Sequence, residues 1–233
     1  MAPKPHTAPQ KVVKATLASR IPEPTPAEPA YPHKVWYICL VGGGAVLLLA
    51  ALVSVYHRTM PGWEQQLFRD VNGVSAPKWL ANQIAKPLSD AVWALVGLSF
   101  VALAVPRFRW RAWQYVAALG SSFVAQYLLE HIIDRPRPAL LMHDVVLRAQ
   151  QGGPGFPSGH VTALTALVLT MWFFVSWPWR ALLAALLVAE MWARIFLGVH
   201  APLDVVGGLA MGMLTVGVLH LLPVKLRRFF KLA

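Results

Sequence analysis

The sequence is poor in charge and in cysteine. Only 13% of its 233 residues are charged, where roughly a quarter is usual for a soluble domain, and 57% are hydrophobic. This shortage of charge excludes an ordinary soluble globular protein. The single cysteine, Cys39, excludes a disulfide framework and a cysteine-based zinc or redox site. The composition therefore indicates a protein that lies in a membrane.

Acidic residues are scarce as well. The chain has 10 Asp and Glu against 21 Lys and Arg, which gives a net charge of +11. Such an excess can indicate a nucleic-acid partner, but much of it lies in the N-terminal segment, in short loops and beside the ends of apolar runs. Basic residues at these places act as membrane-orientation signals. We therefore expect membrane lipids, and no nucleic acid, as partners.

Long apolar runs are abundant. At about 1.5 Å per residue, some 20 helical residues cross a hydrocarbon layer of about 30 Å. The amphipathic residues 63–71 are typical of a helix lying along the membrane surface. The sequence thus predicts an all-α, six-transmembrane-helix bundle with a short interfacial helix after the first span. The predicted spans are residues 35–56, 88–105, 112–133, 160–177, 181–199 and 203–222.

The two ends of the chain differ from this apolar middle. Residues 1–34 are rich in proline and lysine and hold too few large apolar side chains to offset their ordering entropy. We predict a disordered basic tail there, a membrane domain over residues 35–222, and a second basic tail over residues 223–233. No feature of the sequence sets the oligomeric state.

An even number of spans places both ends on one side of the membrane. Arg107, Arg109, Arg111 and Arg180 fall on that same side, which the positive-inside rule assigns to the cytoplasm. The loops after the first, third and fifth spans then face outward. We expect an integral protein of a bacterial cell membrane with cytoplasmic termini.

Polar residues gather in these outward loops. Pro157-Ser158-Gly159-His160 stands where a loop enters a helix, with Ser158 as the predicted N-cap and Gly159 allowing close approach of a ligand. The free N–H groups of a helix N-terminus bind anions. His160 falls in the first turn, beside such an anion.

A second group ends the following apolar hairpin. Arg194 lies one turn before the helix end, His200 follows it, and Asp204 falls in the first turn of the next helix, within reach of a ring nitrogen of His200. A carboxylate beside an imidazole fixes its tautomer and raises its basicity. With Arg137 from the third span, these residues suit phosphoryl transfer, which needs fixed positive charge, a nucleophile and an acid. No carboxylate set for Mg²⁺ accompanies them, so we expect histidine covalent catalysis with no metal and no cofactor.

At these residues the chain resembles the type-2 phosphatidic acid phosphatase family of integral-membrane lipid phosphatases, which is related to vanadium haloperoxidases, bacterial non-specific acid phosphatases and glucose-6-phosphatase. The resemblance covers about residues 56–222 and rests on three motifs. Pro157–His160 matches Pro-Ser-Gly-His completely. Arg194, His200 and Asp204 match Ser-Arg-x5-His-x3-Asp, with Ala193 in place of serine. Arg137-Pro138 matches the end of Lys-x6-Arg-Pro, with Glu130 in place of lysine.

The resemblance implies a role for each matching residue. His200 attacks phosphorus and forms a phosphohistidine, Asp204 orients it, and His160 protonates the leaving oxygen. The phosphate oxygens are held by Arg137, Ser158, Gly159 and Arg194.

Three further residues are candidates for supporting roles. Glu130 would repel a phosphate unless it is paired, and we expect an ion pair with Arg135, Arg137 or His131. Glu190 precedes Arg194 by four residues, on the same helical face, and is its expected partner.

The predicted function is hydrolysis of a lipid phosphate or diphosphate at the outer face of the membrane. Candidate substrates are a polyprenyl diphosphate such as undecaprenyl diphosphate, which we rank slightly ahead, phosphatidic acid and phosphatidylglycerol phosphate. Two alternatives stay open. One is a phosphotransferase that uses the same histidine, and the other is a non-catalytic lipid-binding protein, because the altered first motif can signal lost activity.

Overall fold

The computed structural model describes residues 34–150 and 152–222, and these residues are helical without strands. The predicted all-α class is confirmed. The predicted tails, residues 1–33 and 223–233, lie outside the described residues. The elements are α2 (Lys34–Val55), α3 (Gly62–Asn72), the π-helical η1 (Leu80–Ala85), α4 (Lys86–Ala104), α5 (Arg109–Ile133), α6 (Pro138–Leu141), α7 (Gly159–Met171), the 3-10 helix η2 (Trp172–Phe174), α8 (Trp177–Phe196) and α9 (Pro202–Leu221).

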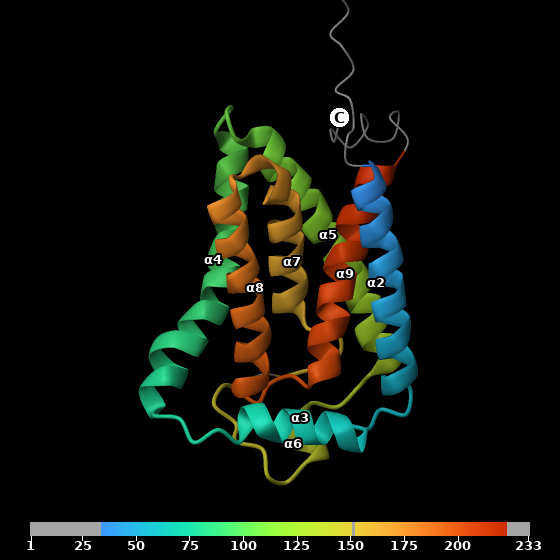
Figure 1. The fold of residues 1–233 in the computed structure, drawn as a ribbon, viewed down its shortest axis with the longest axis vertical. Helices are drawn as coiled ribbons and strands as arrows, with labels where there is room; N and C mark the ends of the chain where they lie inside the picture. The colour runs from blue at the N-terminus through green and yellow to red at the C-terminus, as the bar shows by residue number, and fades with distance from the viewer. Residues whose placement is uncertain (1–33, 151, 223–233) are drawn as a thin grey trace, which may run out of the picture. The chain divides into compact units, whose positions relative to one another are not determined.

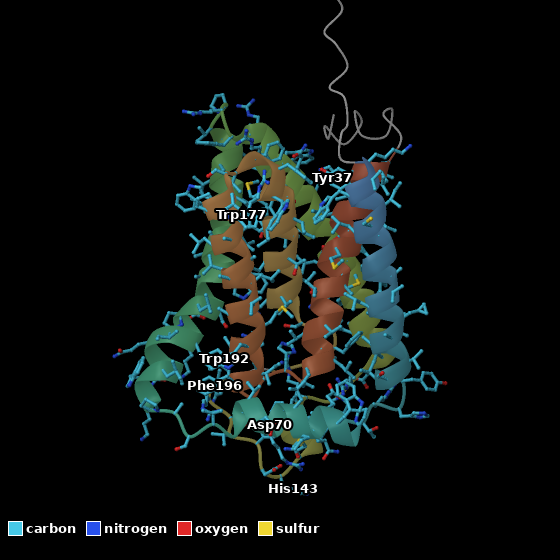
Figure 2. All side chains as sticks on the ribbon, viewed as in Figure 1. Tyr37, Asp70, His143, Trp177, Trp192 and Phe196 are labelled. Atoms are coloured by element: carbon cyan, nitrogen blue, oxygen red, sulfur yellow. The ribbon has the colours of Figure 1, made fainter. Side chains whose placement is uncertain are left out.

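The long helices run alongside one another, and α3 and α6 lie across one end of them (Figure 1). Tyr37 and Trp177 mark the opposite end, whereas Asp70 and His143 lie at the α3 end (Figure 2). The end of α8 and the start of α9 reach the α3 end, and the start of α7 is directed toward that end (Figure 1). The three predicted motifs are therefore brought to one end of the bundle.

Four helical stretches of the described chain are long and apolar enough to cross a membrane. They are Lys34–Val55, Leu80–Ala104, Arg111–Leu141 and Pro202–Leu221. The apolar helix Gly159–Phe174 is shorter than these, and α8 lies outside this group. Helix α7 ends at Met171, earlier than the predicted end of that span at residue 177. Helix α8 begins at Trp177, and Pro178 in its first turn favours a helix start there.

Helix α9 packs closely because its glycines leave no room for a side chain. A Cβ on Gly212 would meet the Thr165 side chain at 2.5 Å, and one on Gly217 would meet Val41 at 2.7 Å. Small residues let helices approach each other in a membrane, where apolar surface alone gives little drive for association. This close packing holds α9 against α2 and α7, and it thereby positions Asp204 at the start of α9.

Large apolar side chains point away from the core on several helices. Examples are Val46 on α2, Val101 on α4 and Leu128 on α5, each more than half exposed. Apolar surface of this extent is not left in water by soluble proteins. It fits an environment of lipid chains around the bundle.

Candidate active site

His200 is held in the turn between α8 and α9. The turn begins at Gly198, whose φ of +79° favours glycine, and a Cβ there would lie 2.8 Å from the Val146 carbonyl oxygen. His200 is buried, and its Nδ1 lies 2.8 Å from the carbonyl oxygen of Gly155. Because a carbonyl only accepts, Nδ1 carries the proton and Nε2 keeps its lone pair. Nε2 in turn lies 3.4 Å from an Nη1 atom of Arg137.

The predicted contact between His200 and Asp204 is present but long. Asp204 Oδ2 lies 3.7 Å from His200 Nδ1, so the Gly155 carbonyl, and not the carboxylate, is the nearer acceptor. Burial lowers the pKa of His200 to about 4, against the opposing effect of Asp204. The imidazole is therefore neutral at pH 7, as a nucleophile must be.

Arg135 forms the centre of a buried ionic cluster. It donates to both carboxylate oxygens of Glu64, at 3.2 and 2.5 Å, to Asp204 Oδ1 at 2.7 Å and to the Thr59 carbonyl at 3.0 Å. Glu64 also accepts from the amide of Leu203 at 2.9 Å. The side chains of Arg135, Glu64 and Asp204 are all fully buried. Arg135 thus joins α3 to α9, and it fixes the carboxylate beside His200.

Of the three partners expected for Glu130, Arg135 is excluded, because it pairs with Glu64 and Asp204. The charge of Glu130 does act on Arg137, whose charged form it stabilises. The Glu130 carboxylate accepts a hydrogen bond of 2.9 Å from Gln126. Gln126 also packs on Gly159, because a Cβ there would meet the Gln126 Nε2 at 2.9 Å. Glu130 therefore reaches the Pro-Ser-Gly-His segment through Gln126.

Ser158 is the N-cap residue of α7, as predicted, but its hydroxyl does not cap the helix. The Ser158 Oγ is buried and has no hydrogen-bond partner among the described residues. Its backbone N–H donates to the Asp204 carbonyl at 2.9 Å, which ties the start of α7 to α9. An orphaned buried hydroxyl costs free energy unless a ligand completes it. The arrangement thus leaves one donor for an anion at this helix N-terminus.

Arg194 presents a second unsatisfied donor. It is buried on α8, and its Nε and Nη2 atoms have no hydrogen-bond partner in the described part of the chain. The predicted partner is confirmed, since Glu190 Oε1 lies 4.0 Å from Arg194 Nε. Glu190 is itself held by Ser89 Oγ, which donates at 3.0 Å. A buried guanidinium with idle donors is suited to hold an anion.

Arg137 and His160 complete the predicted set. Arg137 donates to the carbonyls of Gly152, Gly153 and Val199, at 3.1, 3.0 and 2.7 Å. His160 Nε2 lies 2.8 Å from the indole Nε1 of Trp93 on α4. Because an indole N–H only donates, Nε2 of His160 is the acceptor and Nδ1 carries its proton.

A cavity of about 600 Å³ reaches both His160 and Arg194. Its volume lies in the range of pockets that enclose a drug-sized ligand, about 300–1,000 Å³. Among the residues that the structure describes, no three His, Cys, Asp or Glu side chains form a group able to hold a metal ion. The lining residues are Lys86, Ser89, Asp90, Leu147, Arg148, Ala149, Gln150, His160, Arg194 and Leu197.

Ala193, which replaces the serine of the third motif, is fully buried in an apolar cluster with Ala85 and Phe196. A hydroxyl there would need a partner in apolar surroundings. Sequence reasoning missed Glu64, Trp93, Gln126 and Arg148. These residues lie outside the three motifs. The partners of Glu64 and Trp93 and most of those of Arg148 are distant in the chain, so no local pattern reveals them. Gln126 bonds to Glu130 four residues away, but its contact with Gly159 is equally distant from any local pattern.

The described residues form an all-helical protein in which two buried histidines lie among the three motifs, together with Ser158 and Arg194 donors that have no hydrogen-bond partner in that part of the chain. The chain belongs to the PAP2 superfamily, whose model matches residues 111–228. The family resemblance predicted from the motifs is confirmed. Together with the apolar spans, this membership makes it an integral membrane protein.

Named relatives are lipid phosphatases. A putative undecaprenyl-diphosphatase of Escherichia coli, YbjG, is 33% identical over 100 residues, which cover 42% of this chain and 49% of that protein. The chain thus spans about half the length of this relative. The decaprenylphosphoryl-5-phosphoribose phosphatase of Mycobacterium tuberculosis is 38% identical over 133 residues, covering 54% of this chain and 68% of that protein.

Two solved structures share the fold. Aquifex aeolicus LpxE matches with a TM-score of 0.60 and 24% identity, over 67% of this chain and 93% of that one. The Bacillus subtilis transmembrane phosphatidylglycerolphosphate phosphatase of PAP2 type also matches with a TM-score of 0.60, at 18% identity, over 80% of this chain and 94% of that one.

Proposed function

We propose that the protein is a lipid phosphatase that hydrolyses a lipid phosphate or diphosphate through a phosphohistidine on His200. One observation carries the proposal: the neutral His200 Nε2 lies 3.4 Å from Arg137, at a buried anion site. Family membership and the printed names of the relatives support it. Among lipid phosphates we favour a polyprenyl diphosphate.

In the first step Nε2 of His200 attacks phosphorus, forming an N–P bond while the bond to the leaving oxygen breaks. His160, protonated on both ring nitrogens, transfers its Nδ1 proton to that oxygen. The doubly protonated ring cannot accept from Trp93, so the indole hydrogen bond of the resting site is given up on protonation. The Gly155 carbonyl keeps Nδ1–H of His200 in place, and Asp204 stabilises the positive charge that its ring acquires.

In the second step water attacks the phosphohistidine and gives a proton to His160, the N–P bond breaks, and inorganic phosphate leaves. The equatorial oxygens are held in both steps by the idle Arg194 donors, the Ser158 hydroxyl, the Gly159 amide and Arg137. Preorganised donors of this kind supply several kcal/mol of transition-state stabilisation, about 3–4 kcal/mol for one donor. Glu190 positions Arg194 in both steps, and Arg135 positions Asp204.

We further propose six membrane spans formed by α2, α4, α5, α7, α8 and α9, with α3 at the membrane surface. The helices run alongside one another and α3 lies across their end, which supports this arrangement (Figure 1). In it the end with α3 and the site faces outward, and the end with Arg107 and Arg180 faces the cytoplasm. A lipid substrate then keeps its chain in the bilayer while its head group enters the cavity.

The test is phosphate release from a panel of lipid phosphates by purified wild type, with no metal added. We expect release by wild type, loss of at least a thousandfold with His200→Ala, and, in wild type quenched with alkali during turnover, a phosphoprotein whose label is stable to base and lost in acid, as for a phosphohistidine. Absence of release from every substrate would favour a lipid-binding protein. Transfer of phosphate to an added lipid alcohol in preference to water would favour a phosphotransferase.

A further inference from the structure

The cavity that contains His160 and Arg194 extends well beyond a single phosphate. Its volume is about 600 Å³, and its lining includes a second group of charged side chains. These are Lys86 and Asp90 on α4 and Arg148 from the loop before α7. Neither Lys86 nor Arg148 has a role in the proposed chemistry at phosphorus. The three cations that line the cavity, Lys86, Arg148 and Arg194, outnumber the single lining carboxylate, Asp90.

Lys86 is directed to this cavity by the packing of α4. Lys86, Ser89 and Asp90 share one face of the helix, since residues three and four apart lie above one another. Ser89 Oγ donates to Glu190, and this contact places the face against α8, one turn before Arg194. The Lys86 ammonium donates to Asn82 Oδ1 at 2.9 Å, a neutral partner that leaves its charge uncompensated.

Arg148 is held in place by neutral partners, so no carboxylate among the described residues compensates its charge. Its Nη1 donates to the carbonyls of Asn72 and Phe196, at 2.9 and 2.6 Å, and its Nη2 donates to the Val74 carbonyl at 3.2 Å. The guanidinium lies over the Phe196 ring, 4.2 Å from its centroid. These partners are all neutral, so Arg148 is a rigid source of positive potential at the cavity wall.

We propose that Lys86 and Arg148 form a second phosphate subsite, so that the preferred substrate carries two phosphate groups in its head group. This inference rests on the proposed lipid phosphatase function. In a diphosphate, the terminal phosphorus is attacked by His200, and the bridging oxygen departs with the lipid-linked phosphate. That leaving phosphate gains negative charge as the bond breaks, and Lys86 and Arg148 face it.

The experiment compares kcat/KM for a prenyl diphosphate and for the monophosphate of the same prenyl chain, in one detergent. We expect Lys86→Met to lower the value for the diphosphate by about tenfold, as for one modest charge-assisted hydrogen bond, and to leave the monophosphate within about twofold. Lys86→Arg restores the diphosphate activity. A third arm, a prenyl phosphate carrying a phosphorylated pentose, tells whether the two phosphates are joined directly or through a sugar.

Lys34→Met is the matched control, because Lys34 is an exposed lysine at the start of α2, and the start of α2 lies at the end of the bundle opposite α3 (Figure 2). It should change the activity with neither substrate. An equal loss with both substrates in Lys86→Met, or an equal loss in Lys34→Met, overturns the subsite while leaving the phosphatase intact. If wild type releases phosphate from none of the lipids, the proposed function itself fails, and the two failures are thus distinguished.

Discussion

The ring of His200 is controlled by one backbone carbonyl and one carboxylate. The Gly155 carbonyl, at 2.8 Å from Nδ1, sets the tautomer, and Asp204, at 3.7 Å, supplies charge. A carbonyl does this without a formal charge, so the imidazole stays neutral while buried. Its pKa of about 4 follows from the loss of hydration of the charged form.

This pKa has a consequence for the pH profile. The nucleophile must be neutral, and a base whose pKa is lowered stays neutral to lower pH. We expect the acidic limb of kcat/KM that depends on His200 to lie below pH 5. An ordinary histidine, with a pKa of about 6.5, would already cost about tenfold at pH 5.5. The profile is measured from pH 4 to 8 and corrected for titration of the substrate; an acidic limb near pH 6.5 would contradict the neutral resting state.

At the scale of single residues, the sequence predicts which residues lie in the site better than it predicts the contacts that they make. Ser158, His160, Arg194, His200 and Asp204 lie in short motifs whose spacing reports helix ends, so their convergence was predictable. Their partners were not. Glu64 lies 71 residues from Arg135, and Trp93 lies 67 residues from His160, distances over which no local pattern survives. The hydroxyl of Ser158 was expected to cap α7, and it instead has no hydrogen-bond partner among the described residues.

At the scale of the elements, α3 is fastened to the bundle through polar contacts. Glu64 at its start binds Arg135, and Asn72 at its end binds the chain on both sides of the site. Asn72 Nδ2 donates to the carbonyls of Val146 and Phe196, at 3.0 and 3.1 Å, and its Oδ1 accepts from the Val146 amide at 2.9 Å. The helix therefore holds the loop before α7 against the end of α8.

Arg135→Met tests this fastening. It leaves the two buried carboxylates of Glu64 and Asp204 without their cation, and breaking a buried ionic cluster in this way costs about 3–5 kcal/mol. We expect a large fall in unfolding temperature in detergent, together with loss of activity. Arg69→Gln is the control, because the Arg69–Asp144 pair is half exposed and screened by solvent, so it contributes little to stability. Equal stability of the two variants would show that the cluster does not hold α3.

Element positions were predictable where apolar runs are long. The helices α2, α5 and α9 begin and end within a few residues of the predicted limits, because hydropathy and proline set them. Of the shorter elements, α3 coincides with the helix predicted over residues 63–71, whereas η1 and α6 were not predicted. The π-helical η1 and the one-turn α6 arise from packing among neighbouring segments, and the early end of α7 depends on tertiary contacts around Trp172 and Phe173.

At the scale of the described molecule, the two ends differ in kind. One end has Arg107 and Arg180 beside the helix turns, and the other has the site, α3 and α6 (Figure 1). The sequence predicted this polarity from charge placement alone. The placement of the basic residues predicts which end faces the cytoplasm through the positive-inside rule, and that prediction is tested only in a membrane.

Single cysteines test the orientation. In a Cys39→Ser background, His143→Cys at the α3 end and Arg107→Cys at the other end are treated in intact cells with a membrane-impermeant maleimide. We expect His143→Cys to react and Arg107→Cys to react only after the cells are permeabilised. Both positions are at turns and exposed, so access to reagent is limited by the membrane alone. The reverse pattern would invert the proposed topology.

Asp204 contacts three neighbours at once, with Oδ1 on Arg135 and Oδ2 toward His200 and the Ala201 amide. In a saturation mutagenesis screen we therefore expect substitutions of Asp204 to behave like substitutions of core residues. They should lower the amount of folded protein, and this loss would mask any change in turnover per folded molecule. A dead Asp204 variant is weak evidence about catalysis until its abundance is normalised. Directed evolution of new activity in this scaffold should hold Asp204 fixed and vary the cavity wall.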